Sequence, residues 1–234
     1  MDLIEKKDNL VNRHPWELSR FDSLYKEIKK YYKEGDFLDI GCGDSFFDLK
    51  LLETNLNINK MIGIDIFLDK CKSGKRYSTL NSYEKLKGKK FDTILMFDVL
   101  EHIEDDDKFI KDNLSKLIKD NSRIIMTIPA HQYLYSKHDE DLKHFRRYNK
   151  KMIRELCKNN HFKIVSYHYF YFSLYLYRLI FRNSNNEIND WKNSEKSFKT
   201  KLYRFILNTD YKLCKLFGKI SNGLSLFVVI EKEK

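Results

Sequence analysis

The feature that most constrains the fold is an apolar segment that runs directly into a two-glycine turn. It reads Phe37-Leu-Asp-Ile-Gly-Cys-Gly-Asp44, and a second apolar segment, Ile62-Gly-Ile-Asp65, follows it along the chain. A continuous apolar strand that ends in Gly-x-Gly before a helix is typical of a parallel sheet covered on both faces. The turn exposes backbone N–H groups at the start of that helix, where a ligand can bind.

Helical and strand patterns alternate along the rest of the chain. We expect helices over 14–34, 45–54 and 149–159 and another carrying Phe109 to Ile118, with strands at 36–41, 60–66, 75–79, 91–97, 123–128, from 162 and over 224–231. This alternation predicts an α/β Rossmann-like, doubly wound sheet of seven strands, mostly parallel. Ligands of such sheets bind outside the carboxyl ends of the strands.

The 234 residues suffice for one sizeable α/β domain without a second core. Within this single domain, 1–34 is expected to form an N-terminal helical cap, 35–170 the cofactor-binding core, 171–222 a helical insertion and 223–234 the terminal strand. The insertion has three open interpretations: a cap over the acceptor pocket, a dimer contact, or a helix lying on a membrane surface. Monomer and homodimer both stay open.

The charges around the glycine turn restrict the ligand. A dinucleotide fingerprint requires a third glycine, and Phe46 stands in its place. Asp44 at the helix start and Asp39 in the strand would meet a pyrophosphate with carboxylates. Together with Asp98 they predict a negatively charged pocket, which suits the cationic cofactor S-adenosylmethionine (SAM). Asp65 stands at the spacing of the acid that binds both ribose hydroxyls.

A third segment, Phe91-Asp-Thr-Ile-Leu-Met-Phe-Asp-Val-Leu-Glu-His-Ile103, reads as a buried strand leading into a loop. With the first two segments it resembles the class I SAM-dependent methyltransferases over roughly residues 35–170. Asp39, Gly41 and Gly43 match that family's first motif, Asp65 its ribose acid, and Phe97 to His102 its fourth-strand signature. The resemblance implies SAM as cofactor, S-adenosylhomocysteine as product, and a last strand that is antiparallel beside the sixth.

By this resemblance, Ile66 packs on one face of the adenine, and Asn81 and Ser82 approach its ring. In the N-terminal segment, Trp16 and Arg20 are expected to cover the cofactor as a lid, with Arg20 at the methionine carboxylate. The alternative is a core tryptophan with an exposed arginine. The residues expected at the cofactor are Arg20, Asp39, Gly41, Cys42, Gly43, Asp65, Ile66, Asn81, Ser82, Phe97, Asp98 and His102.

Titratable residues are unusually dense between Ala130 and Tyr148, directly beyond the fifth strand, where a methyl acceptor would lie. His138 is our first choice as general base, held by Asp139 or a neighbour, and His144 is the second. The absence of HExxH or paired Cys/His spacing predicts no zinc site.

Arg146 and Arg147 offer a fork for an anionic acceptor, although one of them is also expected to pair with a nearby carboxylate. The residues assigned to the acceptor are Trp16, His131, Tyr135, Arg146 and Arg147. This block and the N-terminal segment His14-Pro-Trp-Glu-Leu-Ser-Arg20 resemble methyltransferases that modify bacterial surface polysaccharides and small molecules.

The net charge of +10 indicates either a solvated lysine-rich surface or an anionic partner such as a membrane surface. No RNA-binding module is evident, so no nucleic-acid partner is expected. Without a signal peptide or CxxC pair, we expect a cytoplasmic protein, with peripheral membrane contact left open. The favoured interpretation is a SAM-dependent O-methyltransferase acting on a small or sugar- or phosphate-linked acceptor in surface polysaccharide (capsule) biosynthesis. The alternatives are RNA methylation and a non-catalytic SAM-binding partner subunit.

Overall fold

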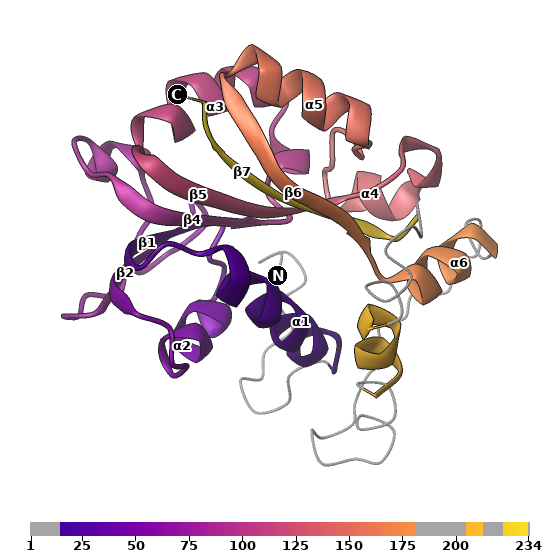
Figure 1. Ribbon diagram of the computed structural model, residues 1–234, viewed down its shortest axis with the longest axis horizontal. Coiled ribbons are helices and arrows are strands. Elements are labelled where there is room, and N and C mark those ends of the chain that lie inside the picture. Colours follow the sequence, from indigo (N-terminus) through magenta and orange to yellow (C-terminus); the bar gives the residue numbers. More distant parts are fainter. Residues whose placement is uncertain (1–14, 181–204, 213–221, 234) are drawn as a thin grey trace.

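The computed structural model of this chain describes residues 15–180, 205–212 and 222–233. One mixed sheet lies at its centre (Figure 1). The strands are β1 (Gly35–Ile40), β2 (Ile58–Ile64), β3 (Tyr77–Leu80), β4 (Phe91–Phe97), β5 (Ile118–Pro129), β6 (Phe162–Phe170) and β7 (Ser225–Lys232). Their order is β3-β2-β1-β4-β5-β7-β6, and β7 is antiparallel to both of its neighbours. The predicted Rossmann-like sheet with an antiparallel last strand is confirmed.

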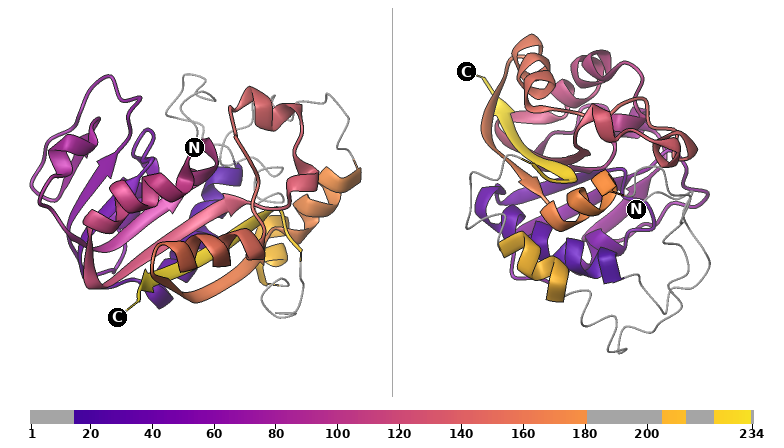
Figure 2. Two further views of the ribbon diagram at one scale, coloured as in Figure 1. Left: turned by 90° about the horizontal axis from the view of Figure 1, so that it is seen from above. Right: turned by 90° about the vertical axis from the view of Figure 1, so that its right-hand side faces the viewer.

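Helices cover both faces of this sheet. α1 (Pro15–Tyr31) and α2 (Phe46–Leu52) lie on one face, and α3 (Asp106–Asp112) and α5 (Lys150–Asn159) lie on the other (Figures 1 and 2). The short α4 (Lys137–Asp141), α6 (Phe172–Ile180) and the helix at 205–212 gather toward one end of the molecule. That end contains the carboxyl ends of the parallel strands, so the elements that follow those strands can build a site there.

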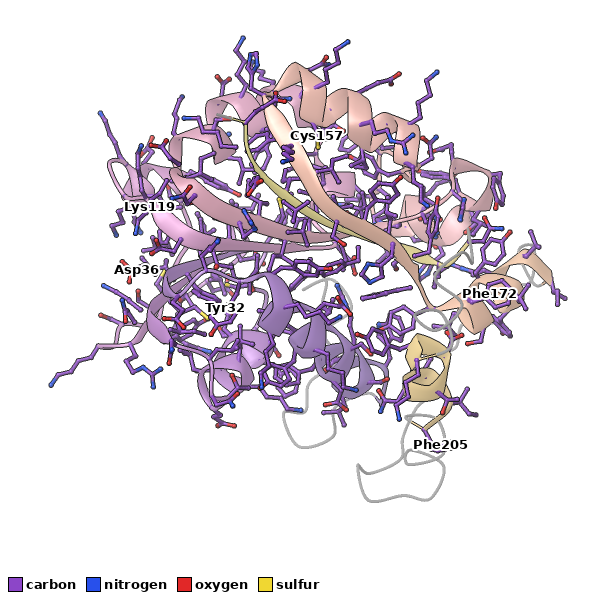
Figure 3. All side chains as sticks on the ribbon, viewed as in Figure 1. Tyr32, Asp36, Lys119, Cys157, Phe172 and Phe205 are labelled. Carbon is purple, nitrogen blue, oxygen red and sulfur yellow. The ribbon has the colours of Figure 1, made fainter. Side chains whose placement is uncertain are left out.

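Each face of the sheet has its own apolar core. Leu24 and Ile28 of α1 pack with Phe37 of β1 in one core. Ile153 and Cys157 of α5 pack in the other, and Figure 3 shows Cys157 between its helix and the sheet. Strands buried on both faces must be apolar almost throughout, which explains why they were recognisable as continuous apolar runs.

β5 begins earlier than the expected start at 123. Its first residue, Ile118, pairs with Phe91, and the register then shifts before Arg123 pairs with Thr93. The hydroxyl of Ser122 donates to the carbonyl of Phe91 and supports this irregularity. A polar stretch thus enters the strand through a local distortion, which an apolar pattern does not reveal.

The aromatic stretch at 167–181 is divided between two elements. β6 ends at Phe170 and α6 begins at Phe172, because Tyr171 between them has φ of 61°, in the left-handed region. Of the helical insertion expected over 171–222, the structure describes 171–180, 205–212 and 222, which include α6 and the helix at 205–212. In the described part of the chain no helix has the length and apolar character needed to cross a bilayer.

Candidate cofactor and acceptor site

The glycine turn lies directly against the loop that follows β4. Gly41 has φ of +78°, and a Cβ there would lie 2.4 Å from Cγ2 of Val99. Gly43 is also left-handed, with φ of +54°. Ser45 adopts φ of 74° just before α2 and is completely buried, although serine rarely takes this conformation. The turn therefore requires two glycines and a strained serine to bring its backbone N–H groups to the strand ends.

Asp65 is fixed at the edge of this turn by two backbone donors. The N–H of Gly43 donates to Oδ2 at 3.0 Å, and the N–H of Phe67 donates to Oδ1 at 3.0 Å. Beside it, the side chains of Ile66 and Phe67 are 61% and 68% exposed. A carboxylate flanked by two exposed apolar side chains suits a ribose and an adjoining purine. Phe67 was not among the residues expected at the cofactor. Its position directly after Ile66 was the one feature of the sequence that could have indicated it.

Asp39 does not contribute the negative charge that its position suggested. It is 3% exposed, and burial and the neighbouring Asp48 raise its pKa well above the usual range. Burial likewise raises the pKa of Asp48 to about 6, and the hydroxyl of Tyr77 donates to Asp48 at 2.7 Å. The two carboxyl groups raise the cost of ionising each other, because ionising both would place two charges in one buried site. Asp39 is therefore a buried structural residue next to the turn, and burial favours its neutral form.

Cys42 also serves packing. Its thiol is buried, and a Cβ on Gly63 would lie only 2.7 Å from its sulfur. Burial raises the pKa of the Cys42 thiol, so it remains protonated.

Arg20 and Asp98 form an ion pair at the carboxyl ends of the strands. The guanidinium of Arg20 lies 2.7 Å from Asp98 Oδ2 and also donates to the hydroxyl of Thr127 at 3.1 Å. That hydroxyl donates to Asp98 Oδ1 at 2.9 Å. Both signs of charge are thus present at this point, because Arg20 lies beside the Asp98 that was expected to make the pocket negative. Trp16 packs on Tyr171 with ring centroids 4.5 Å apart.

The remaining residues expected at the cofactor differ in how deeply they are buried. Asn81 is exposed and accepts from Lys85 at 2.9 Å. Ser82 caps the 3-10 helix η2 (Tyr83–Leu86). Phe97 is buried in the core, whereas His102 is half-buried beside the ring of His144, with centroids 4.6 Å apart.

Asp139 is the centre of the acceptor-side block. Its carboxylate accepts two bonds from Arg147, at 2.8 and 3.0 Å, and one from Nδ1 of His144 at 2.9 Å. Burial opposes ionisation, but the bond from His144 and the charge of Arg147 lower the pKa of Asp139 to about 2. The structure therefore places His144, and not our first choice His138, against Asp139. Arg147 is bonded to this carboxylate, which agrees with the alternative that one of the two arginines pairs with a nearby carboxylate.

The other acceptor-side residues are also engaged. Arg146 pairs with Asp106 at 3.0 Å and does not form a fork with Arg147. The hydroxyl of Tyr135 donates to the carbonyl of His144 at 2.7 Å. His131 is buried and stacks on Tyr169 with centroids 5.0 Å apart; burial and the charge of Arg147 lower its pKa.

Two residues that sequence reasoning left out belong to this region. Glu101 follows Asp98 in the loop after β4 and is 1% exposed; burial and the charge of Asp98 raise its pKa. Arg178 of α6 is half-buried, and its pKa is lowered by burial and then by the like charge of Arg147. Glu101 lies inside the matched Val-Leu-Glu-His segment, and Arg178 is the charge that interrupts an apolar helix.

Comparison with known proteins agrees with this geometry. Residues 19–167 match a family model described as a methyltransferase domain. No curated protein matches the chain. Among solved structures, phosphoethanolamine N-methyltransferase 2 of Haemonchus contortus, in complex with SAM, aligns with a TM-score of 0.58 and 16% identity. That alignment covers 92% of this chain and 53% of the other, so this chain spans about half of that enzyme's length.

Two further structures align over nearly their whole length. A SAM-dependent methyltransferase from Archaeoglobus fulgidus is 18% identical with a TM-score of 0.54, covering 91% of this chain and 94% of the other. A putative methyltransferase in complex with the Trm112 methyltransferase activator of Haloferax volcanii is 12% identical with a TM-score of 0.54, covering 95% and 98%. At these identities the likeness concerns the fold.

Proposed function

Because this chain belongs to the methyltransferase-domain family and is a SAM-dependent methyltransferase, we propose that it methylates an oxygen atom of a small, anionic acceptor. The observation that carries the anionic part is Arg178. Within the described residues no hydrogen bond or ion pair engages its guanidinium, although it is half-buried near Arg147 and acts electrostatically on His138. A carboxylate or phosphate of the acceptor would compensate this charge and form bidentate bonds with it.

The transfer itself is a displacement at the methyl carbon. As the acceptor oxygen forms its bond to that carbon, the bond to sulfur breaks and its electron pair remains on sulfur, giving neutral S-adenosylhomocysteine. The hydroxyl proton must leave the acceptor. Nδ1 of His144 is held by Asp139, so Nε2 is the nitrogen that would take this proton. His138 remains a second proposal for the same role.

We assign the ribose of the cofactor to Asp65 and its methionine moiety to the Arg20–Asp98 pair. Asp65 would bind both ribose hydroxyls, and Ile66 with Phe67 would cover the adenine. The methionine end of SAM carries one ammonium and one carboxylate, which match Asp98 and Arg20 in sign. This orientation would bring the methyl group to the loop after β4, beside Glu101 and His144.

The resemblance to enzymes of surface glycans favours a sugar- or phosphate-linked acceptor, and this is part of the proposal. The test is incubation of the enzyme with methyl-labelled SAM and a metabolite extract, fractionated by charge, with labelled products identified by mass. We expect label in the anionic fraction, and Arg178→Ala should raise the acceptor KM at least about tenfold with little change in kcat. Lys158→Ala, which removes an exposed charge from α5, is the control. Label confined to neutral products, or an unchanged KM in Arg178→Ala, would overturn the anionic assignment.

A further inference from the structure

The loop after β4 and the acceptor-side block bring two histidines and a glutamate together. One ligand atom from each of Glu101, His102 and His144 lies within 4.8 Å of the other two. The two segments are joined by a bond from the N–H of Phe145 to the carbonyl of Glu101, at 2.8 Å. The cluster is therefore built by tertiary structure, which explains why it has no recognisable spacing in the sequence.

The carboxylate of Glu101 is the strongest sign that this cluster awaits a ligand. The residue is 1% exposed, and among the described residues its Oε2 has no hydrogen-bond partner. An unpaired buried oxygen of this kind costs free energy unless something binds it. A cation would satisfy it, since a transition-metal ion binds oxygen and nitrogen ligands of this kind at about 2.0–2.2 Å.

The second histidine has the supporting contacts of a metal ligand. Nδ1 of His144 bonds to the buried Asp139, which is itself held by Arg147. Such a carboxylate fixes the tautomer and leaves Nε2 with its lone pair free for a metal. The same Asp139 also restricts rotation of the ring beside His102.

We propose that Glu101, His102 and His144 bind one divalent transition-metal ion at the acceptor side of the cofactor. Two imidazoles and one carboxylate suit a first-row ion better than calcium or magnesium. The sequence had predicted no metal site, because it offered no spacing motif. If the proposed function holds, the ion would bind the acceptor oxygen and lower the pKa of its hydroxyl. His144 would then be a ligand, and the hydroxyl proton would pass to His138, the second base candidate.

The test uses the full chain, freed of metal with EDTA and then dialysed, in the absence of SAM and acceptor. Binding of Mn²⁺ is followed by the loss of the electron paramagnetic resonance signal of the free ion, with Zn²⁺ as competitor. We expect about one site per chain, and Glu101→Gln and His144→Ala should each weaken Mn²⁺ binding at least about tenfold. His161→Asn, which removes an exposed imidazole at a left-handed position that asparagine tolerates, should bind like the wild type.

Failure to bind either ion, or unchanged binding in both site variants, would overturn the site. If either variant loses S-adenosylhomocysteine binding through misfolding, His102→Ala, at a half-buried ring, provides the same test. Methyl transfer is then measured after EDTA and after return of Mn²⁺. At least about tenfold stimulation is expected, and full activity of the EDTA-treated enzyme would overturn the ion's role while leaving SAM-dependent transfer intact.

Discussion

Arg20 on the first helix and Asp98 after β4 form an ion pair of 2.7 Å at the carboxyl ends of the strands. The pair joins an N-terminal segment to the centre of the sheet, and Thr127 bridges the two side chains. Two opposite charges held side by side are complementary to an amino acid, which carries both signs on neighbouring atoms. The methionine moiety of SAM is such a group.

Removing Arg20 should weaken cofactor binding without unfolding the protein. A hydrogen bond to a charged group contributes about 1.5–3 kcal/mol, and partial exposure of Asp98 reduces this value. We therefore expect Arg20→Ala to raise the Kd for S-adenosylhomocysteine about tenfold in isothermal titration calorimetry. Lys29→Ala, an exposed change on the same helix, should leave it unaltered. Equal affinity of Arg20→Ala and wild type would contradict the assignment.

Asp65 should contribute more than Arg20, because its carboxylate can accept bonds from both ribose hydroxyls. Asp65→Ala is expected to raise the same Kd by about 10- to 100-fold, and the Kd of Asp65→Asn should lie between those of the wild type and Asp65→Ala. Asp69→Ala, an exposed change farther along the same loop, is the matched control. If Asp65→Ala binds like this control, the ribose does not lie at the end of β2.

The buried carboxyl pair predicts a decline in stability as the pH rises. In the folded state the pKa of Asp48 is about 6, and the pKa of Asp39 is raised well above its usual value. Folding favours their neutral forms, so this stability is full below about pH 4 and is lost as pH rises through the folded pKa values. In that window the free energy of unfolding should fall by up to about 1.4 kcal/mol per pH unit for each carboxyl that is protonated only in the folded state.

Asp39→Asn removes one of these titrations and should flatten the decline, measured by urea unfolding from pH 4 to 9. Asp112→Asn, at an exposed carboxylate of α3, should keep the slope of the wild type. Parallel curves for Asp39→Asn and wild type would show that Asp39 ionises freely.

Arg147 should matter for stability far more than its neighbour Arg146. Arg147→Ala leaves the buried Asp139 without its bidentate partner, which is expected to cost about 3–5 kcal/mol in urea unfolding. Arg146→Ala breaks a partly exposed pair with Asp106 and should cost about 1 kcal/mol. Arg147→Lys should not restore stability, because an ammonium cannot reproduce the two parallel bonds. Equal losses in the two alanine variants would contradict this assignment.

Local sequence carried most of the information about the fold and about the position of Asp65 beside the glycine turn. Continuous apolar runs such as β4 identify buried parallel strands, and Asp65 is tied to the glycine turn by chain topology. These features depend on neighbours along one segment or on the fixed geometry of parallel strands. The early start of β5 escaped prediction because it depends on a register shift opposite Phe91.

The pairings in the acceptor-side block were predicted less well, because they depend on how the loop folds and not on the regular spacing of a helix or strand. Asp139 directly follows His138, yet it bonds to His144 and Arg147. Whether a carboxylate is charged also depends on burial, as Asp39 demonstrates. Arg178 and Glu101 stand out only once their surroundings are known.

The contacts around Asp139 concentrate the shape of its loop in one side chain. Ser136, His144 and Arg147 all bond to this carboxylate, so the stretch that holds them is cross-linked from within. Losing this one group would release all three partners at once.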